Sequence, residues 1–323
     1  MTLSRICAAG AFGILALGVT GSASAACKLN VINQYHVTMD TNEPLADVTI
    51  NGQHVRFKVD TSSASTLISR RGAEALGLKA RRMREAFVPG AGGGDVPGEA
   101  FIEELKLGDA VTHNSNMMVF GEGNASAPYV GVLGQDMLGQ GDLEFDLANG
   151  VMRVIQPKGC GGDQVVYWGK AYSVAPMVTS DDSGDVKVYV GLNGKRALAQ
   201  LDSGVVVSVV ALSAAGRAGV IADRNFQGVI DSSGAPISVG LFPSVAVGDE
   251  SVKNAKLRIV DEFHGEERRG LGLATPDAAD FPDMLLGDDF IRSHHIYVSR
   301  EQGKLYFSYN GGPIFRASPP KTP

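Results

Sequence analysis

The sequence lacks the short motifs by which many enzymes are recognised. It contains no HExxH zinc motif, no CxxC pair, no P-loop and no GxSxG nucleophile motif. The sequence therefore gives no support for a zinc hydrolase, a P-loop nucleotide hydrolase or a hydrolase with a serine nucleophile of these types. Basic residues are also few, since 29 Lys and Arg stand against 35 Asp and Glu and the net charge is -6. A chain without an excess of positive charge is not expected to bind nucleic acid.

Aromatic residues make up only 7% of the chain, whereas glycine is abundant at 41 residues. This balance is typical of many short strands joined by tight turns, and it predicts an all-β protein with few helices. The length of 323 residues suggests about two domains.

Long apolar runs are absent after the first 25 residues. Within 1–25, Arg5 precedes an apolar core over 6–19, and Ala23-Ser24-Ala25 forms an A-x-A cleavage site, which together predict a signal peptide. The core is too short to span a bilayer as an anchor. We therefore expect cleavage near Ala25, a mature protein with no transmembrane anchor, and a periplasmic or secreted location.

Cysteine is scarce, with three residues in the whole chain. Cys7 lies in the expected signal peptide, so Cys27 and Cys160 would remain in an oxidising compartment, where one disulfide is the expected outcome. Two free thiols are one alternative. Lipidation of Cys27 is another, although the preceding Ser24-Ala25-Ala26 lacks the leucine expected before a lipidated cysteine.

The sequence after the signal contains an internal repeat. At an offset of 142 residues, three features recur in the same order: Asn51-Gly52 as Asn193-Gly194, Asp60 as Asp202, and Gly77 as Gly219. At an offset of 153, two more recur: Val132-Leu133-Gly134 as Leu285-Leu286-Gly287, and Asn149-Gly150 as Gln302-Gly303. An ordered series of matches indicates a duplicated unit.

Each half has a strongly β pattern. The Asn-Gly pairs stand between strand-like runs and predict tight hairpins. Short helices are expected over 71–76 and 213–218, each ending at a glycine. The segment 157–163 is rich in Gly and Pro and predicts a linker, so we expect one domain over 26–160 and a second over 161–323.

Asp60 and Asp202 each follow an apolar strand and precede small hydroxyl residues. A single aspartate in such a place is usually a turn or cap residue, but this pair sits at matched positions of the repeat. Two carboxylates held close together cannot both ionise, so they share one proton. The ionised member can then activate water, and the protonated member can donate to a developing oxyanion.

These residues resemble the signature of the pepsin and retropepsin type of aspartic peptidase, which is two apolar residues, Asp, Thr or Ser, and Gly, with an apolar-apolar-Gly sequence downstream. The second half matches well with Leu201-Asp202-Ser203-Gly204 and Leu285-Leu286-Gly287, and the first half matches with Val59-Asp60-Thr61 and Val132-Leu133-Gly134. The resemblance implies a bilobal fold with a cleft between two barrel-like lobes. It also implies that the Thr61 and Ser203 hydroxyls brace the two loops and that Gly134 and Gly287 leave no room for a Cβ.

Ser62 departs from the signature, which has glycine there. If the Ser62 hydroxyl binds the Asp60 carboxylate, it favours the ionised form of Asp60 and places the shared proton on Asp202. If instead the added side chain blocks the cleft, the first half is degraded as a catalytic unit.

The resemblance also implies a β-hairpin flap in each half. The flap candidates are Gly90, Gly92, Gly93 and Gly94 in the first half and Ser232, Ser233 and Gly234 in the second. Both segments are also compatible with ordinary exposed loops.

We therefore predict a monomeric aspartic endopeptidase that acts on a peptide or protein substrate and needs no metal or other cofactor. Asp60 and Asp202 are its catalytic pair. The alternatives are an inactive pseudo-peptidase of the cell envelope that binds peptides in the same cleft, and an envelope protein that reuses the scaffold for a structural purpose.

Overall fold

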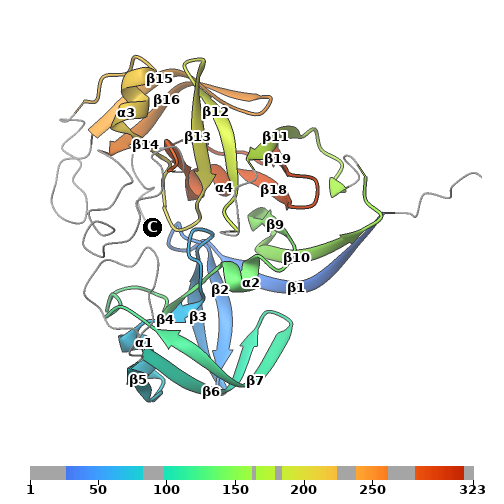
Figure 1. Cartoon of the computed structure of the whole chain (residues 1–323), viewed down its shortest axis with the longest axis vertical. Helices are drawn as coiled ribbons and strands as arrows, with labels where there is room; N and C mark the ends of the chain where they lie inside the picture. Colours follow the sequence, from blue (N-terminus) through green and yellow to red (C-terminus); the bar gives the residue numbers. More distant parts are fainter. Residues whose placement is uncertain are drawn as a thin grey trace, which may run out of the picture.

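The computed structural model describes residues 27–82, 98–161, 165–178, 184–223, 238–260 and 281–315. It is built almost wholly of strands (Figure 1). The strands of the first half are β1 (Lys28–Thr38), β2 (Leu45–Ile50), β3 (Gln53–Val59), β4 (Leu67–Ile68), β5 (Ala80–Arg82), β6 (Gly98–Leu107), β7 (Ala110–Val119), β8 (Gly131–Leu133), β9 (Asp142–Asp146) and β10 (Val151–Lys158). Those of the second half are β11 (Ser173–Val178), β12 (Lys187–Leu192), β13 (Lys195–Leu201), β14 (Val209–Ala211), β15 (Ser238–Val247), β16 (Glu250–Val260), β17 (Met284–Leu286), β18 (His294–Ser299) and β19 (Lys304–Tyr309).

The described helices are short: α1 (Arg70–Ala75), α2 (Gln135–Leu138), a 3-10 turn η1 (Leu147–Asn149), α3 (Leu212–Arg217) and α4 (Asp288–Ile291). The helices α1 and α3 begin one residue before the predicted ranges. Gly77 and Gly219 follow them with φ of 69° and 73°, the left-handed conformation that ends a helix and that glycine adopts without strain. The predicted all-β class is therefore confirmed.

Six strands of the first half form a closed ring. Hydrogen bonds run from β2 through β3, β8, β4, β7 and β6 and return to β2. The pairs β3–β8 and β4–β7 are parallel, and the other pairs are antiparallel. Closure removes the free sheet edges within the ring, and its interior holds buried side chains such as Phe57 and Ile102.

The second half forms a ring of the same connectivity, from β12 through β13, β17, β14, β16 and β15 back to β12. Its parallel pairs, β13–β17 and β14–β16, are the equivalents of those in the first ring. The two rings lie at the bottom and the top of Figure 1. The matched strand order is what the repeat predicts, while the division into domains at residue 160 stays a prediction.

A third sheet joins the halves and takes three strands from each. Its order is β1, β10, β9, β18, β19 and β11. At its centre β9 pairs with β18, with Glu144 opposite Tyr297. The start of β1 is fixed to the end of β10 by a disulfide between Cys27 and Cys160, which meet because β1 lies beside β10 with Lys28 opposite Lys158. None of the described helices is long and apolar enough to cross a membrane.

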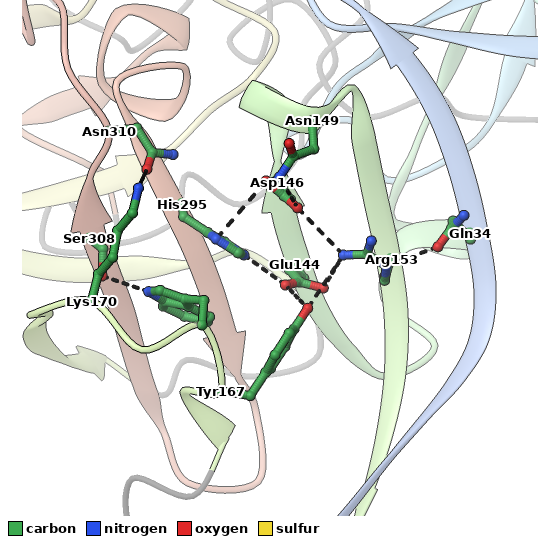
Figure 2. A network of polar contacts seen from close by, with 11 residues as sticks. Gln34, Glu144, Asp146, Asn149, Arg153, Tyr167, Lys170, His295, Ser308 and Asn310 are labelled. Atoms are coloured by element: carbon green, nitrogen blue, oxygen red, sulfur yellow. Dashed lines mark hydrogen bonds and ion pairs between the residues drawn. The ribbon is translucent and has the colours of Figure 1, made fainter.

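A polar network centred on the buried Glu144 lies on one face of this joining sheet (Figure 2). Glu144 on β9 is fully buried and accepts hydrogen bonds from Tyr167 at 2.5 Å, His295 at 2.7 Å and Arg153 at 2.9 Å. Trp168 stacks on the His295 ring with centroids 4.1 Å apart. The network therefore ties β9 and β10 of the first half to β18 of the second, with the segment after the disulfide laid across them.

The Glu144 carboxylate should make the fold depend on pH. Burial alone would raise its pKa, but the three hydrogen bonds outweigh burial and hold the pKa of Glu144 below the ordinary value of 4.5. A lowered pKa stabilises the folded state above about pH 4.5, and this contribution is lost as the pH falls through the folded-state pKa.

We expect Glu144→Gln to lower the free energy of unfolding at pH 7 by about 3 kcal/mol, because the fully buried Glu144 carboxylate is lost from its charged contact with the partly buried Arg153. Its difference from wild type should shrink as the pH falls below the range in which Glu144 is ionised. Urea unfolding between pH 3 and pH 7 measures both quantities. Glu122→Gln is the control, since the Glu122 side chain is 80% exposed; an equal loss in both variants would contradict the assignment.

Candidate active site

The two candidate aspartates stand at the ends of equivalent strands. Asp60 follows β3 and Asp202 follows β13, each after a hairpin with Asn and Gly at positive φ. The parallel neighbour of each strand then fixes the backbone at the carboxylate. The Asp60 N–H donates to the Leu133 carbonyl at 3.0 Å, and the Asp202 N–H donates to the Leu286 carbonyl at 2.9 Å.

Thr61 and Ser203 bind each other across the two halves. The Thr61 N–H donates to the Ser203 hydroxyl and the Ser203 N–H to the Thr61 hydroxyl, both at 3.1 Å. The Thr61 hydroxyl donates onward to the Leu201 carbonyl at 2.8 Å, and the Ser203 hydroxyl to the Val59 carbonyl at 3.0 Å. Thr61 and Ser203 are both fully buried, so these four bonds hold the two aspartate loops in a fixed mutual position.

Gly204 lies between the two carboxylates. Its N–H donates to the Asp202 carboxylate at 2.7 Å, and a Cβ built on it would stand 2.6 Å from Asp60 Oδ2. Any side chain at position 204 would therefore collide with the Asp60 carboxylate. The same backbone residue touches both acids, which places them close enough to influence each other's charge.

The two carboxyls differ in their surroundings. Asp202 is 5% exposed, and burial, followed by the negative charge of Asp60, raises the pKa of Asp202 to about 6. One oxygen of Asp60 instead accepts three hydrogen bonds, from the Ser62 N–H at 2.9 Å, the Ser62 hydroxyl at 2.7 Å and the Ser63 N–H at 3.1 Å. Donors to a carboxylate favour its charged form.

The Ser62 hydroxyl donates to the Asp60 carboxylate, which is the arrangement of the first of its two alternatives. Its side chain is exposed rather than buried against the opposite loop. The N–H groups that bind the carboxylate do not depend on the side chain, so the departure from glycine preserves the backbone pattern of the signature.

Gly134 and Gly287 lie directly behind the aspartate loops. A Cβ on Gly134 would stand 2.5 Å from the Ser65 carbonyl carbon, and one on Gly287 would stand 2.7 Å from the Val205 carbonyl oxygen. Both glycines are therefore needed for the close approach that the resemblance implies.

Two further pairs of residues support the loops, and we did not single them out in the sequence. The Thr66 hydroxyl donates to Asp136 at 2.7 Å, and the Ser208 hydroxyl donates to Asp289 at 2.6 Å. Each hydroxyl also accepts from the N–H of the downstream glycine at 3.0 Å. The repeat could have revealed them, because both pairs recur at the offsets that relate the halves.

One pair of equivalent positions breaks the symmetry. Gln135 begins α2 and donates to the Thr61 carbonyl at 2.7 Å. Its equivalent is Asp288 at the start of α4, which is fully buried, and neither of its carboxylate oxygens has a hydrogen-bond partner within the described part of the chain. Burial raises the pKa of Asp288 well above the ordinary value.

The predicted flap residues Gly90, Gly92, Gly93, Gly94, Ser232, Ser233 and Gly234 lie outside the described residues. Among the residues that are described, no group of three or more His, Cys, Asp or Glu side chains is placed to hold a metal ion. The adjacent His294 and His295 bind different partners, Glu250 and Glu144.

A comparison with protein families supports the resemblance. Residues 46–140 match the family described as gag-polyprotein putative aspartyl protease. This retropepsin-type match covers Asp60, Thr61 and Gly134, and so it falls on the half in which Ser62 departs from the signature. It supports a protease-type function. No curated protein matches the chain.

Ser62→Gly tests the effect of the hydroxyl on the acid pair. The Ser62 hydroxyl donates to Asp60 and also lowers the pKa of Asp202. Its loss makes negative charge on the pair less favourable, so the apparent pKa values of the pair should rise by about half a unit or more. In a pH-rate profile the acid limb should move upward while peptide cleavage is retained.

Ser63→Ala is the matched control, because the Ser63 hydroxyl donates to the Ser65 carbonyl and not to a carboxylate. If Ser62→Gly has the acid limb of wild type, the hydroxyl does not influence the pair. If it creates activity that wild type lacks, the side chain blocks the site.

Proposed function

We propose that the protein is an aspartic endopeptidase whose catalytic residues are Asp60 and Asp202. The observation that carries the proposal is the pair of loops bound through Thr61 and Ser203, with a buried, high-pKa Asp202 beside a strongly hydrogen-bonded Asp60. The family match over 46–140 agrees with a hydrolase of this type.

The reaction uses one proton shared by the pair. With Asp60 ionised and Asp202 protonated, a water between them gives a proton to Asp60 while its oxygen attacks the scissile carbonyl carbon. Asp202 donates its proton to the carbonyl oxygen, which would otherwise become an oxyanion. The proton on Asp60 then passes to the leaving nitrogen as the C–N bond breaks, and Asp202 recovers its proton from the collapsing hydroxyl. The apparent pKa values belong to the pair as a unit.

The inactive alternative, a peptide-binding pseudo-peptidase of the cell envelope, depends on damage to the first half. Asp60 is hydrogen-bonded at least as fully as Asp202, and Ser62 adds a donor to its carboxylate. These contacts favour the active form. A raised pKa at one of two adjacent acids in a pair of matched loops is more typical of a functional site than of a structural one.

The proposed setting follows from the disulfide and the first residues. The Cys27–Cys160 bridge supports an extracytoplasmic location, periplasmic or secreted, after removal of 1–25. Both acids belong to one chain, which supports a monomer of two lobes, 26–160 and 161–323. The substrate class is a peptide or protein, with flaps expected over the candidate glycines and serines.

Replacement of either acid tests the proposal. Asp60→Asn and Asp202→Asn should each lower kcat by about 10³-fold or more, because general acid and base catalysis are lost together. Wild-type cleavage should fall as the pH rises through about 6, where Asp202 loses its proton. A peptide library digested between pH 3 and pH 8, with a statine-type inhibitor as a second arm, measures both effects.

The exposed Asp249 provides the control as Asp249→Asn, and circular dichroism checks that each variant is folded. A wild-type protein that binds the peptides or the inhibitor without cleaving would favour the pseudo-peptidase. Equal cleavage by wild type and Asp202→Asn would rule out the proposed pair.

A further inference from the structure

A lysine reaches across from the first half to the aspartate loop of the second. Lys58 is on β3, two residues before Asp60. Its ammonium donates to the Gly204 carbonyl at 2.8 Å and pairs with Glu43 at 3.1 Å. The side chains of Lys58 and Glu43 are only 14% and 18% exposed. The ion pair is therefore largely buried and lies against the residue whose N–H binds Asp202.

The repeat places a different residue at the position of Lys58. The residue 142 positions after Lys58 is Gln200, which lies on β13 two residues before Asp202. The equivalent of Glu43 is Asp185, and it pairs at 3.4 Å with Lys187 on β12, which stands opposite Gln200. Because burying a charge is unfavourable unless it is paired, a lysine at only one of the two positions calls for a local reason.

The groups that face Lys58 supply such a reason. They are Glu43, Tyr129, Asp60, Asp202 and Asp288. Burial alone would lower the pKa of Lys58, but the neighbouring groups, Glu43 first, outweigh it and raise that pKa, so the ammonium stays charged. The positive charge also opposes the rise in the pKa of Asp202.

We propose, resting on the proposed function, that Lys58 is a positioning residue of the acid pair: its ammonium, held by Glu43, fixes the Gly204 carbonyl so that the Gly204 N–H stays aimed at Asp202, and its charge favours a pair with one ionised member. The first half thereby orients the catalytic loop of the second.

The direction of the pKa shift follows from removal of the positive charge of Lys58. Without the cation, negative charge on the pair is less favourable, so both apparent pKa values rise and the range of single protonation moves to higher pH. The loosened Gly204 also leaves Asp202 less well oriented, which lowers kcat rather than raising KM.

The main variant is Lys58→Gln, because glutamine occupies the equivalent position of the second half. It should raise the upper apparent pKa of the pair by about half a unit or more and lower kcat at the new optimum by about tenfold. Lys58→Arg, which keeps the charge, should restore most of the wild-type profile. Arg70→Gln is the control, since the Arg70 side chain is 25% exposed and pairs with the exposed Glu122.

Two readouts keep the outcomes apart. Peptide cleavage gives the pH-rate profile, and carbon NMR of protein with labelled aspartate carboxyls follows the titration of Asp60 and Asp202 whether or not any peptide is cleaved. A shifted titration in Lys58→Gln, absent from Arg70→Gln and reversed by Lys58→Arg, supports the proposal even if the wild type proves inactive, in which case the proposed function alone fails. If the carboxyls of Lys58→Gln titrate as in the wild type, the proposal is overturned. It is also overturned if kcat falls only because the variant is less stable while its pH profile is unchanged.

Discussion

The arrangement of this protein depends on the four hydrogen bonds between the loops of Thr61 and Ser203. Both residues are fully buried, so each donor and acceptor left unmatched would cost about 1–3 kcal/mol. Each residue both donates to and accepts from the other, and each hydroxyl donates onward to a backbone carbonyl of the opposite half. The halves can satisfy these groups in one docking geometry, and the positions of Asp60, Asp202 and Gly204 follow from it.

Much of this arrangement could be predicted from the sequence, because the same local signals for turns, helix ends and close approach occur in both halves. The Asn-Gly pairs specify hairpins since both residues adopt positive φ. Gly77 and Gly219 specify helix ends, and Gly134 and Gly287 leave room for the loops. Each of these signals is local in sequence, and its recurrence at a fixed offset separates it from chance.

The features that could not be predicted are those in which the halves differ. The contact from Lys58 to Gly204 spans 146 residues, and the bond from His295 to Glu144 spans 151. The equivalent positions hold other residue types, Gln200 for Lys58, and Asp142 with Tyr297 for His295 with Glu144, so the repeat gives no guidance, and a lone lysine or histidine in a strand has no local pattern that indicates its partner. The buried Asp288 is similar, because its burial depends on how α4 meets the loop of Asp202.

The register of the joining sheet has a consequence for the ancestry of the chain. Opposite Glu144 on β9 stands Tyr297 on β18, and these are equivalent residues at the offset of 153. The neighbouring pairs, Phe145 with Ile296 and Leu143 with Val298, exchange with each other under the same offset. A pseudo-twofold axis therefore passes through the Glu144–Tyr297 pair.

Two copies of the first half joined in this register would bring a buried Glu144 against its own copy, and two copies of the second half would bring two tyrosine rings to the same point. Two facing carboxylates are unfavourable unless they share a proton. The mixed pair of Glu144 and Tyr297 avoids that contact, and only a chain whose halves differ can place a single carboxylate beside the pseudo-twofold axis.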